Sequence, residues 1–232
     1  MRYKSLLAAT GLLASGLAFT QPVQAAPTTA AGPTASTCSI TLPARIYIGG
    51  PTTDLTVKQK QDCIDAGVKQ ADWRGTQNGD EVTEFIEFLN YSRSTKLTLK
   101  DDVAPIGTVI WSGHGAQTAG GDDIPQKSAT HAIKYDSWGN VVATKSGSTV
   151  SVTAQIGCYV HKENRYVRWP NKTGILQFAE KGSTVWHNLA SFKTNSKGEY
   201  TVKYQPGKVR QYRLYVYESP SVWWKLTGTK TV

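Results

Sequence analysis

Apolar and polar residues alternate along much of the C-terminal half of the chain, which is the pattern of strands with one buried face. The clearest stretch is residues 185–216, where turn clusters at Asn195–Gly198 and Pro206–Gly207 separate three runs rich in aromatic and β-branched residues. Such runs between turn signals predict three consecutive antiparallel strands joined as a meander. Alternation places six residues of the last two runs on the buried face: Tyr200, Val202, Tyr204, Tyr212, Leu214 and Val216.

Similar runs lie on both sides of residues 113–126, a segment rich in Gly, Asp and Pro that is the natural boundary between two modules. Residues 55–61 and 81–89 fit either a strand or a helix. About eight short strands in roughly 100 residues are typical of a β-sandwich. The sequence therefore predicts an all-β fold of two immunoglobulin-like or fibronectin-like antiparallel β-sandwich modules in tandem, at 37–126 and 127–232. The other predicted strands are 44–48, 94–99, 108–111, 131–135, 149–156, 159–169, 174–178 and 221–227.

The first 25 residues have the features of a signal peptide. Arg2 and Lys4 precede an apolar run at 6–19, and small residues follow near Ala25. Residues 26–36 form a low-complexity spacer with too little apolar surface to fold. No second apolar run is long enough to cross a bilayer. We therefore expect a secreted, extracellular and cell-wall-associated protein without a membrane span.

The three cysteines are Cys38, Cys63 and Cys158. Because export permits disulfides, we expect a bond between Cys38 and Cys63 that ties down the start of the first module. Cys158 is then unpaired, and three interpretations stay open: a buried free thiol in a strand, an intermolecular bridge, or a nucleophile.

Charge differs between the two modules. Residues 127–232 hold 16 Lys and Arg against 5 Asp and Glu, a net charge of +11, whereas residues 26–126 hold 8 against 12, a net charge of −4. A basic exported module would attract anionic polymers, including wall polymers and nucleic acid, and salt would weaken that attraction. A solvated basic surface without a particular partner is the alternative.

Two groups of motifs carry a family resemblance. In the C-terminal half they are S-T-V-S-V-T-A at 148–154, R-x-x-x-W-P-N-K-T-x-x-L-Q-F at 165–178 and G-S-T-V-W-H-N-L-A-S-F-K-T at 182–194; in the N-terminal half they are D-C-I-D-A-G-V-K-Q-A-D-W at 62–73 and P-I-G-T-V-I-W at 105–111. Together these resemble the two-module β-sandwich proteins that actinobacteria secrete, over roughly residues 38–230. The resemblance implies an immunoglobulin-like fold and export rather than an activity.

One constellation suggests an enzyme. The strand 108–111 leads into S-G-H-G, which resembles the histidine motif of caspase-like and metacaspase-like cysteine peptidases, and Cys158 lies 44 positions after His114. In this alternative His114 is the general base and Cys158 the nucleophile. The segment around Cys158 lacks the continuation of those families, and no α/β crossover follows the first strand. The sequence therefore favours a protein that is not an enzyme.

Metal and cofactor sites are not predicted. The histidines His114, His131, His161 and His187 have neither zinc-ligand spacing nor paired cysteines. The acidic turns Asp101–Asp102 and Gly120–Asp123 do not follow the spaced pattern of a calcium loop.

The candidate ligand-binding residues lie on the predicted outward face of the last strands. Aromatic rings interleaved with cations can stack on sugars or bases while the cations meet phosphate or carboxylate. The alternative is that the rings pack across strands or form a tyrosine corner. The leading hypothesis is a non-enzymatic binding or cell-surface interaction protein. Its ligand would be an anionic or carbohydrate polymer of a cell wall or matrix, and nucleic acid is an alternative ligand. An inhibitor of an exported peptidase is a residual hypothesis. The six residues are Lys203, Arg213, Tyr215, Tyr217, Trp223 and Trp224.

Overall fold

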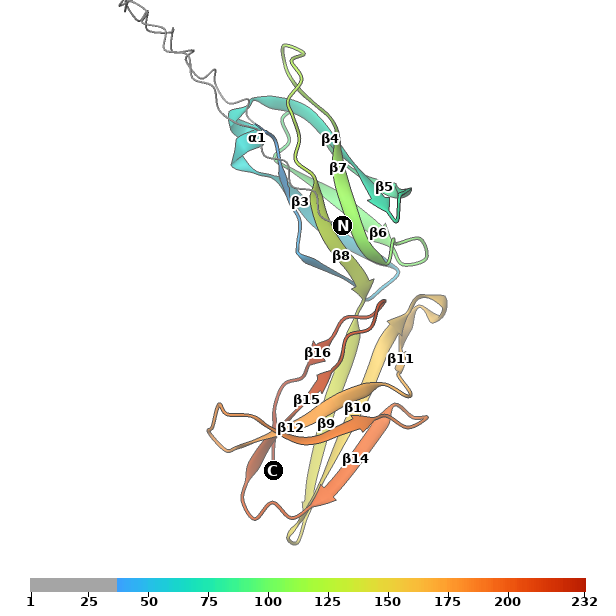
Figure 1. Cartoon of the computed structure of the whole chain (residues 1–232), viewed down its shortest axis with the longest axis vertical. Coiled ribbons are helices and arrows are strands. Elements are labelled where there is room, and N and C mark those ends of the chain that lie inside the picture. The colour runs from blue at the N-terminus through green and yellow to red at the C-terminus, as the bar shows by residue number, and fades with distance from the viewer. Residues whose placement is uncertain (1–36) are drawn as a thin grey trace, which may run out of the picture. The chain divides into compact units, whose positions relative to one another are not determined.

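The computed structural model describes residues 37–232, so the predicted signal peptide and spacer lie outside the described residues. The described chain is all-β and forms two immunoglobulin-like sandwiches in tandem, as the sequence predicts (Figure 1). Within residues 37–232, no helix is long and apolar enough to cross a membrane.

The first sandwich packs a three-stranded sheet against a five-stranded one, drawn from blue to green in Figure 1. The smaller sheet has the order β1-β3-β6, with β1 at Ile40–Thr41, β3 at Thr52–Gln59 and β6 at Ser94–Lys100. The larger has the order β2-β8-β7-β4-β5, and its members are β2 (Arg45–Ile48), β4 (Val68–Gln77), β5 (Asp80–Phe88), β7 (Gly107–Thr118) and β8 (Ala129–Tyr135). Every pair is antiparallel except β2–β8. The ambiguous residues 81–89 are therefore a strand, and 55–61 divides between β3 and the short helix α1 (Gln61–Asp65).

The second sandwich runs from yellow to red in Figure 1. One sheet places β10 (Thr149–Val160) between β9 (Ser137–Ser146) on one side and β11 (Arg165–Arg168) with β14 (Glu199–Tyr204) on the other. The facing sheet has the order β13-β12-β15-β16, with β17 also on β15. Its members are β12 (Thr173–Glu180), β13 (His187–Lys193), β15 (Arg210–Val216), β16 (Lys225–Leu226) and β17 (Lys230–Thr231).

The predicted meander is wrong, although its strands and its buried face are right. β13 and β15 both pair with β12, whereas β14 crosses to the other sheet and pairs with β10. The predicted turns exist, with positive φ at Gly198 and Gly207, but they carry the chain between sheets. Alternation determines which face of a strand is buried, but it does not determine which strand pairs with it. Here the inner faces of β14 and β15 meet across the core from opposite sheets.

Two further strand predictions differ from the structure. Residues 159–169 do not form one strand: β10 ends at Val160, the 3₁₀ turn His161–Glu163 follows, and β11 folds back onto β10. Asn164 has a left-handed φ of 52°, which allows the reversal. The sequence also did not predict β9, which pairs with β10 along ten positions.

The change from one hydrophobic core to the other comes after Tyr135. The strand β8 follows the Gly-, Asp- and Pro-rich segment that the sequence predicts as the boundary between the modules. It nevertheless pairs with β7 and β2, and its Ile133 is buried in the first core. The second core begins with Val141 of β9. Residues 129–135 therefore belong structurally to the first sandwich.

The two cores are joined by specific contacts near Asp136. The Tyr135 carbonyl accepts a hydrogen bond from the backbone of Trp223 at 3.1 Å, and the Ser137 hydroxyl donates to the Trp223 carbonyl at 2.8 Å. Tyr159 of β10 packs in the first core, and its hydroxyl donates to the carboxylate of Asp101 at 2.5 Å. Burial, together with this bond, raises the pKa of Tyr159, so the phenol stays protonated.

Candidate binding surface

The outward face of β15 is where the sequence places the binding residues. Tyr212, Leu214 and Val216 are fully buried, as predicted, so the residues between them face away from the core. Arg213 and Tyr215 are half-buried on that outer face, and Tyr217, just after the strand, is 40% exposed.

Two neighbouring side chains fix the position of the Arg213 guanidinium. Its guanidinium lies 4.1 Å from the ring centre of Trp186, and its Nε donates a hydrogen bond to Gln177 of β12 at 2.8 Å. Partial burial lowers the pKa of Arg213, but an arginine keeps its charge at neutral pH. The side chain therefore presents a fixed, planar cation stacked on an indole.

A second stack continues from Tyr215. Its ring stacks on Trp224 with centroids 5.8 Å apart, and it meets Tyr217 edge-on at 5.5 Å. The guanidinium of Arg45 lies 5.2 Å from the ring centres of both Trp223 and Trp224. The six outward residues of these two stacks form what we name the aromatic strip: Arg45, Trp186, Arg213, Tyr215, Tyr217 and Trp224.

Two members of the aromatic strip were not predicted from the sequence. Arg45 lies far from the other members along the chain, so no local pattern connects it with them, although alternation in A-R-I-Y-I does place Arg45 and Tyr47 opposite the buried Ile46 and Ile48. Trp186 precedes β13 and reaches Arg213 only because β13 and β15 flank the same strand.

Trp223, which the sequence places among the ligand-binding residues, is buried between the two cores and does not lie on an outer surface. It is 4% exposed, and its indole nitrogen donates to the Ile46 carbonyl at 2.8 Å. Tyr47 and Lys134 also contact its ring. The expected regular strand over both tryptophans is absent, since β16 begins only at Lys225. Of the two, Trp224 is the one open to solvent.

Lys203 does not lie beside Arg213. It is exposed on β14 opposite Ser151 of β10, in the sheet that faces the one carrying the aromatic strip. The outer faces of two packed sheets point in opposite directions. The structure therefore separates Lys203 from the other predicted ligand-binding residues, because the meander on which that grouping rested does not exist.

The proposed dyad residues have unrelated surroundings. His114 is exposed on β7, at a bulge, with its Nδ1 3.1 Å from the carboxylate of Asp72. Cys158 is 7% exposed on β10, and burial raises the pKa of its thiol. A nucleophilic cysteine needs a lowered pKa, so Cys158 has the environment of a buried structural thiol. The other two cysteines form the predicted Cys38–Cys63 disulfide.

Carboxylates of both acidic turns accept hydrogen bonds from other side chains of the protein. Asp123 accepts a hydrogen bond from Gln117 and Asp122 one from Thr118, while Asp101 is bonded to Tyr159. Among residues 37–232, no group of three or more His, Cys, Asp or Glu side chains could hold a metal ion.

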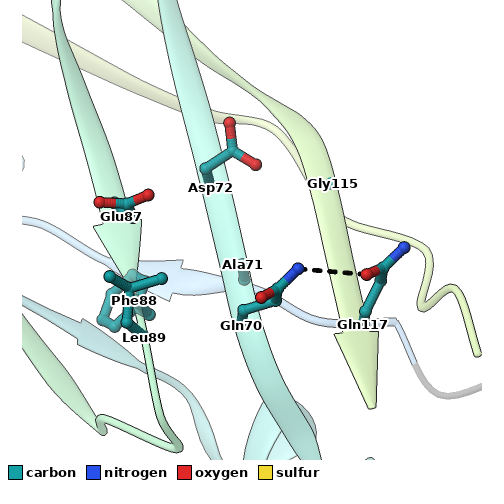
Figure 2. A pocket seen from close by; sticks show the side chains of 8 residues that line it. All are labelled: Gln70, Ala71, Asp72, Glu87, Phe88, Leu89, Gly115 and Gln117. Carbon is teal, nitrogen blue, oxygen red and sulfur yellow. Dashed lines mark hydrogen bonds between the residues drawn. The ribbon is translucent and has the colours of Figure 1, made fainter. Parts of the chain in front are cut away.

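Two hollows accompany these surfaces. Beside the aromatic strip, Tyr47, Asp136 and Trp224 line an open hollow of ≈ 440 Å³ with Lys225 and Leu226. On the first sandwich, residues of β5, β4 and β7 line a smaller hollow of ≈ 210 Å³. Figure 2 shows the side chains that line it.

The smaller hollow is polar. Asp72 and Glu87 lie opposite each other across β4 and β5, and Gln70 donates a hydrogen bond to Gln117 at 3.1 Å (Figure 2). Gly115, which lies opposite Asp72 on β7, leaves room between the strands. The Asp72 carboxylate is already paired with Arg74 at 3.3 Å and His114 at 3.1 Å, so Glu87 is the one carboxylate of this lining without an ion pair among residues 37–232.

No family model matches the chain, and no curated protein matches it. Solved structures that match include the human OSCAR ligand-binding domain (11% identity, 85% of this chain and 98% of that one, TM-score 0.28) and the D00-D0 domain of intimin (14%, 84% and 98%, 0.28). A Salmonella alpha-2-macroglobulin matches at 11% identity over 85% of this chain and 15% of its own, with a TM-score of 0.40. These values are too low to carry any argument about function.

Proposed function

We propose that this is a secreted, non-catalytic binding protein whose aromatic strip holds an anionic polysaccharide outside the cell. The observation that carries the proposal is the pair of stacked guanidiniums, Arg213 on Trp186 and Arg45 beside Trp224, on one outward surface. Exposed ring faces stack on sugar rings, and planar guanidiniums pair with carboxylates in bidentate geometry. A uronic-acid polymer offers both groups in every residue.

Three further features support the proposal. The module that carries most of the aromatic strip has a net charge of +11 and would attract a polyanion over long range. The Cys38–Cys63 disulfide fits an oxidising compartment outside the cytoplasm. The protonated, buried state of Cys158 disfavours the peptidase alternative.

The test compares Arg213→Ala with Lys203→Ala, which removes the same charge from the opposite sheet. We expect wild-type protein to be retained on immobilised alginate and not on dextran. Arg213→Ala should weaken retention about five- to tenfold, the size of one stacked, charge-assisted contact, and Lys203→Ala much less. Tyr217→Ala, at an exposed ring, should weaken it without affecting the fold.

Two results would overturn the proposal. If both charge variants lose retention equally, binding depends on net charge and not on the aromatic strip. If the wild-type protein passes through alginate at low salt, the ligand class is wrong. Thermal unfolding of each variant distinguishes a lost contact from a lost fold.

A further inference from the structure

The hollow beside the aromatic strip combines aromatic residues with an ion pair. Its lining, in a volume of ≈ 440 Å³, consists of Tyr47, Asp136, Trp224, Lys225 and Leu226. Tyr47 is 42% exposed and Trp224 is half-buried, and exposed faces of such rings stack on sugars. The volume is in the range of small-molecule sites, so the hollow admits one sugar unit.

Three groups fix the Asp136 carboxylate. Its Oδ1 accepts a hydrogen bond from the Ser137 backbone at 2.8 Å, and its Oδ2 accepts one from the Tyr166 hydroxyl at 2.8 Å. Nζ of Lys225 lies 3.7 Å from Oδ1. Gly49 leaves the room that this arrangement needs, since a Cβ there would lie 2.4 Å from the Tyr166 hydroxyl oxygen. Burial, followed by the hydrogen bond to Asp136, raises the pKa of Tyr166, so the phenol stays protonated and remains a donor.

Asp136 and Lys225 keep hydrogen-bonding capacity for a ligand. Their side chains are 24% and 40% exposed. An ionised carboxylate accepts about four hydrogen bonds, and those from Ser137 and Tyr166 leave acceptor sites open. Lys225 lies too far from Oδ1 for a hydrogen bond, so within residues 37–232 its ammonium donors are also free. Asp136 therefore requires a donor from the ligand, and Lys225 an acceptor.

A pair of neighbouring hydroxyls satisfies both groups. One hydroxyl donates to Asp136 while its neighbour accepts from Lys225, because a hydroxyl can do either. A carboxylate of the ligand could accept from Lys225 but would be repelled by Asp136. The hollow therefore suits the ring hydroxyls of a sugar acid and not its carboxylate.

We propose that this hollow holds one unit of the uronic-acid polymer by its ring hydroxyls, and so selects polymers in which those hydroxyls are unsubstituted. The sugar ring would lie against Tyr47 and Trp224, while carboxylates along the polymer meet Arg45 and Arg213 of the aromatic strip. This selectivity rests on the function proposed for the aromatic strip. Charge alone cannot produce it, since an ester on a hydroxyl leaves every carboxylate in place.

The probes are two matrices: immobilised alginate, and the same alginate with its ring hydroxyls acetylated. Acetylation removes the donors that Asp136 requires and keeps the number of carboxylates. We expect wild-type protein to be retained about tenfold more weakly on the acetylated matrix, the size of one hydrogen bond to a charged group. Arg213→Ala should keep the same ratio between the two matrices, because Arg213 would contact carboxylates and not hydroxyls.

Asp136→Asn tests the sign of the effect. The asparagine oxygen can accept the Ser137 hydrogen bond and its amide can donate to the Tyr166 hydroxyl, so the local bonds are kept while the charge is removed. If only charge matters, this loss of a negative charge strengthens attraction to a polyanion. We expect the opposite, about five- to tenfold weaker retention on alginate and a much smaller difference between the matrices. Glu180→Gln, which removes a carboxylate paired with Lys208 outside the hollow, should not weaken retention.

A second variant covers the case in which Asp136→Asn does not fold, which thermal unfolding shows. Tyr47→Ala leaves every hydrogen bond of Asp136 in place and removes one ring of the hollow. It should weaken retention on alginate about fivefold, the size of one stacking contact.

The outcomes separate this selectivity from the function of the aromatic strip. Equal retention of wild-type protein on the two matrices would overturn the selectivity and leave that function standing. Tighter retention of Asp136→Asn than of wild type would also overturn it, as would a ratio between the matrices that disappears in Arg213→Ala. Wild-type protein that passes through both matrices at low salt would overturn the function itself, and the selectivity with it.

Discussion

The indole nitrogen of Trp223 donates a hydrogen bond to the backbone carbonyl of Ile46 at 2.8 Å, across 177 positions of sequence. Ile46 lies on β2 in the first core, and Trp223 follows β15 of the second sandwich. The bond is buried, so it is shielded from competing water. The last part of the chain is thereby fixed to one of its first strands.

This bond predicts the effect of Trp223→Phe. Phenylalanine keeps most of the apolar contact but leaves the buried Ile46 carbonyl without its donor, which should lower the free energy of unfolding by about 1–2 kcal/mol. Urea unfolding followed by circular dichroism measures it. Trp224→Phe is the matched control, since its indole nitrogen has no hydrogen bond within residues 37–232, and equal losses for both variants would contradict the role assigned to Trp223.

A second prediction concerns Gly157 on β10. A Cβ at this position would lie 2.0 Å from Nε1 of Trp138 and 2.4 Å from the Val167 carbonyl, so neither an indole nor a backbone group leaves room for it. Trp138 also carries the guanidinium of Arg168 at 4.9 Å. We expect Gly157→Ala to destabilise the protein by about 1–3 kcal/mol through overpacking.

The control for that substitution is Gly228→Ala. A Cβ there has nothing within 4 Å, so the melting temperature should stay within about a degree of wild type. If differential scanning calorimetry gives the same melting temperature for Gly157→Ala as for Gly228→Ala, the close packing of Trp138 on β10 is not maintained in solution.

The sequence predicted which segments form strands better than it predicted how those strands pair. Period-two alternation identified the buried residues of β15, such as Leu214, because the period of a strand is a local property. It could not show that β14 crosses to the other sheet, since the same alternation suits either partner. The grouping of Lys203 with Arg213 failed for that reason.

The missed parts of the candidate sites depend on contacts that are distant in sequence. Arg45 joins the aromatic strip only after β2 and the segment after β15 are brought together. Trp186 likewise meets Arg213 only because β13 and β15 flank β12.

Cys158 gives a third prediction. Its thiol is buried and its pKa is raised by that burial, so both access and ionisation oppose alkylation. Native protein treated with iodoacetamide at neutral pH should remain unlabelled, one thiol should react in denaturant, and three should react after reduction. Fast labelling of native protein that slows in a His114→Ala variant would instead support the peptidase alternative.

Titration of the same thiol affects stability at high pH. Its folded pKa lies above the ordinary value of 9.0, so the unfolded chain loses this proton first as pH rises. The contribution of the buried thiol is therefore complete below pH 9 and is lost above it. Cys158→Ala should reduce the alkaline fall of the unfolding free energy relative to wild type.

The last prediction concerns acid. His131 is buried and its pKa is lowered from the ordinary value of 6.5, so below that pH the unfolded chain binds a proton that the folded chain resists. Its contribution to stability is complete above pH 6.5 and is lost as the pH falls towards the folded pKa. Burial is the main cause of the lowered pKa, and the charged groups that line the hollow beside His131 are Lys60, Asp62 and Lys127.

Urea unfolding at steps from pH 7.5 to pH 5 measures this effect. We expect His131→Gln to lose less stability over that interval than wild type, whereas His187→Gln, an exposed position on β13, should follow the wild-type curve. Carboxylates titrate alike in all three proteins, so the difference isolates His131. Parallel curves for wild type and His131→Gln would mean that burial does not lower the pKa of His131 in the folded chain.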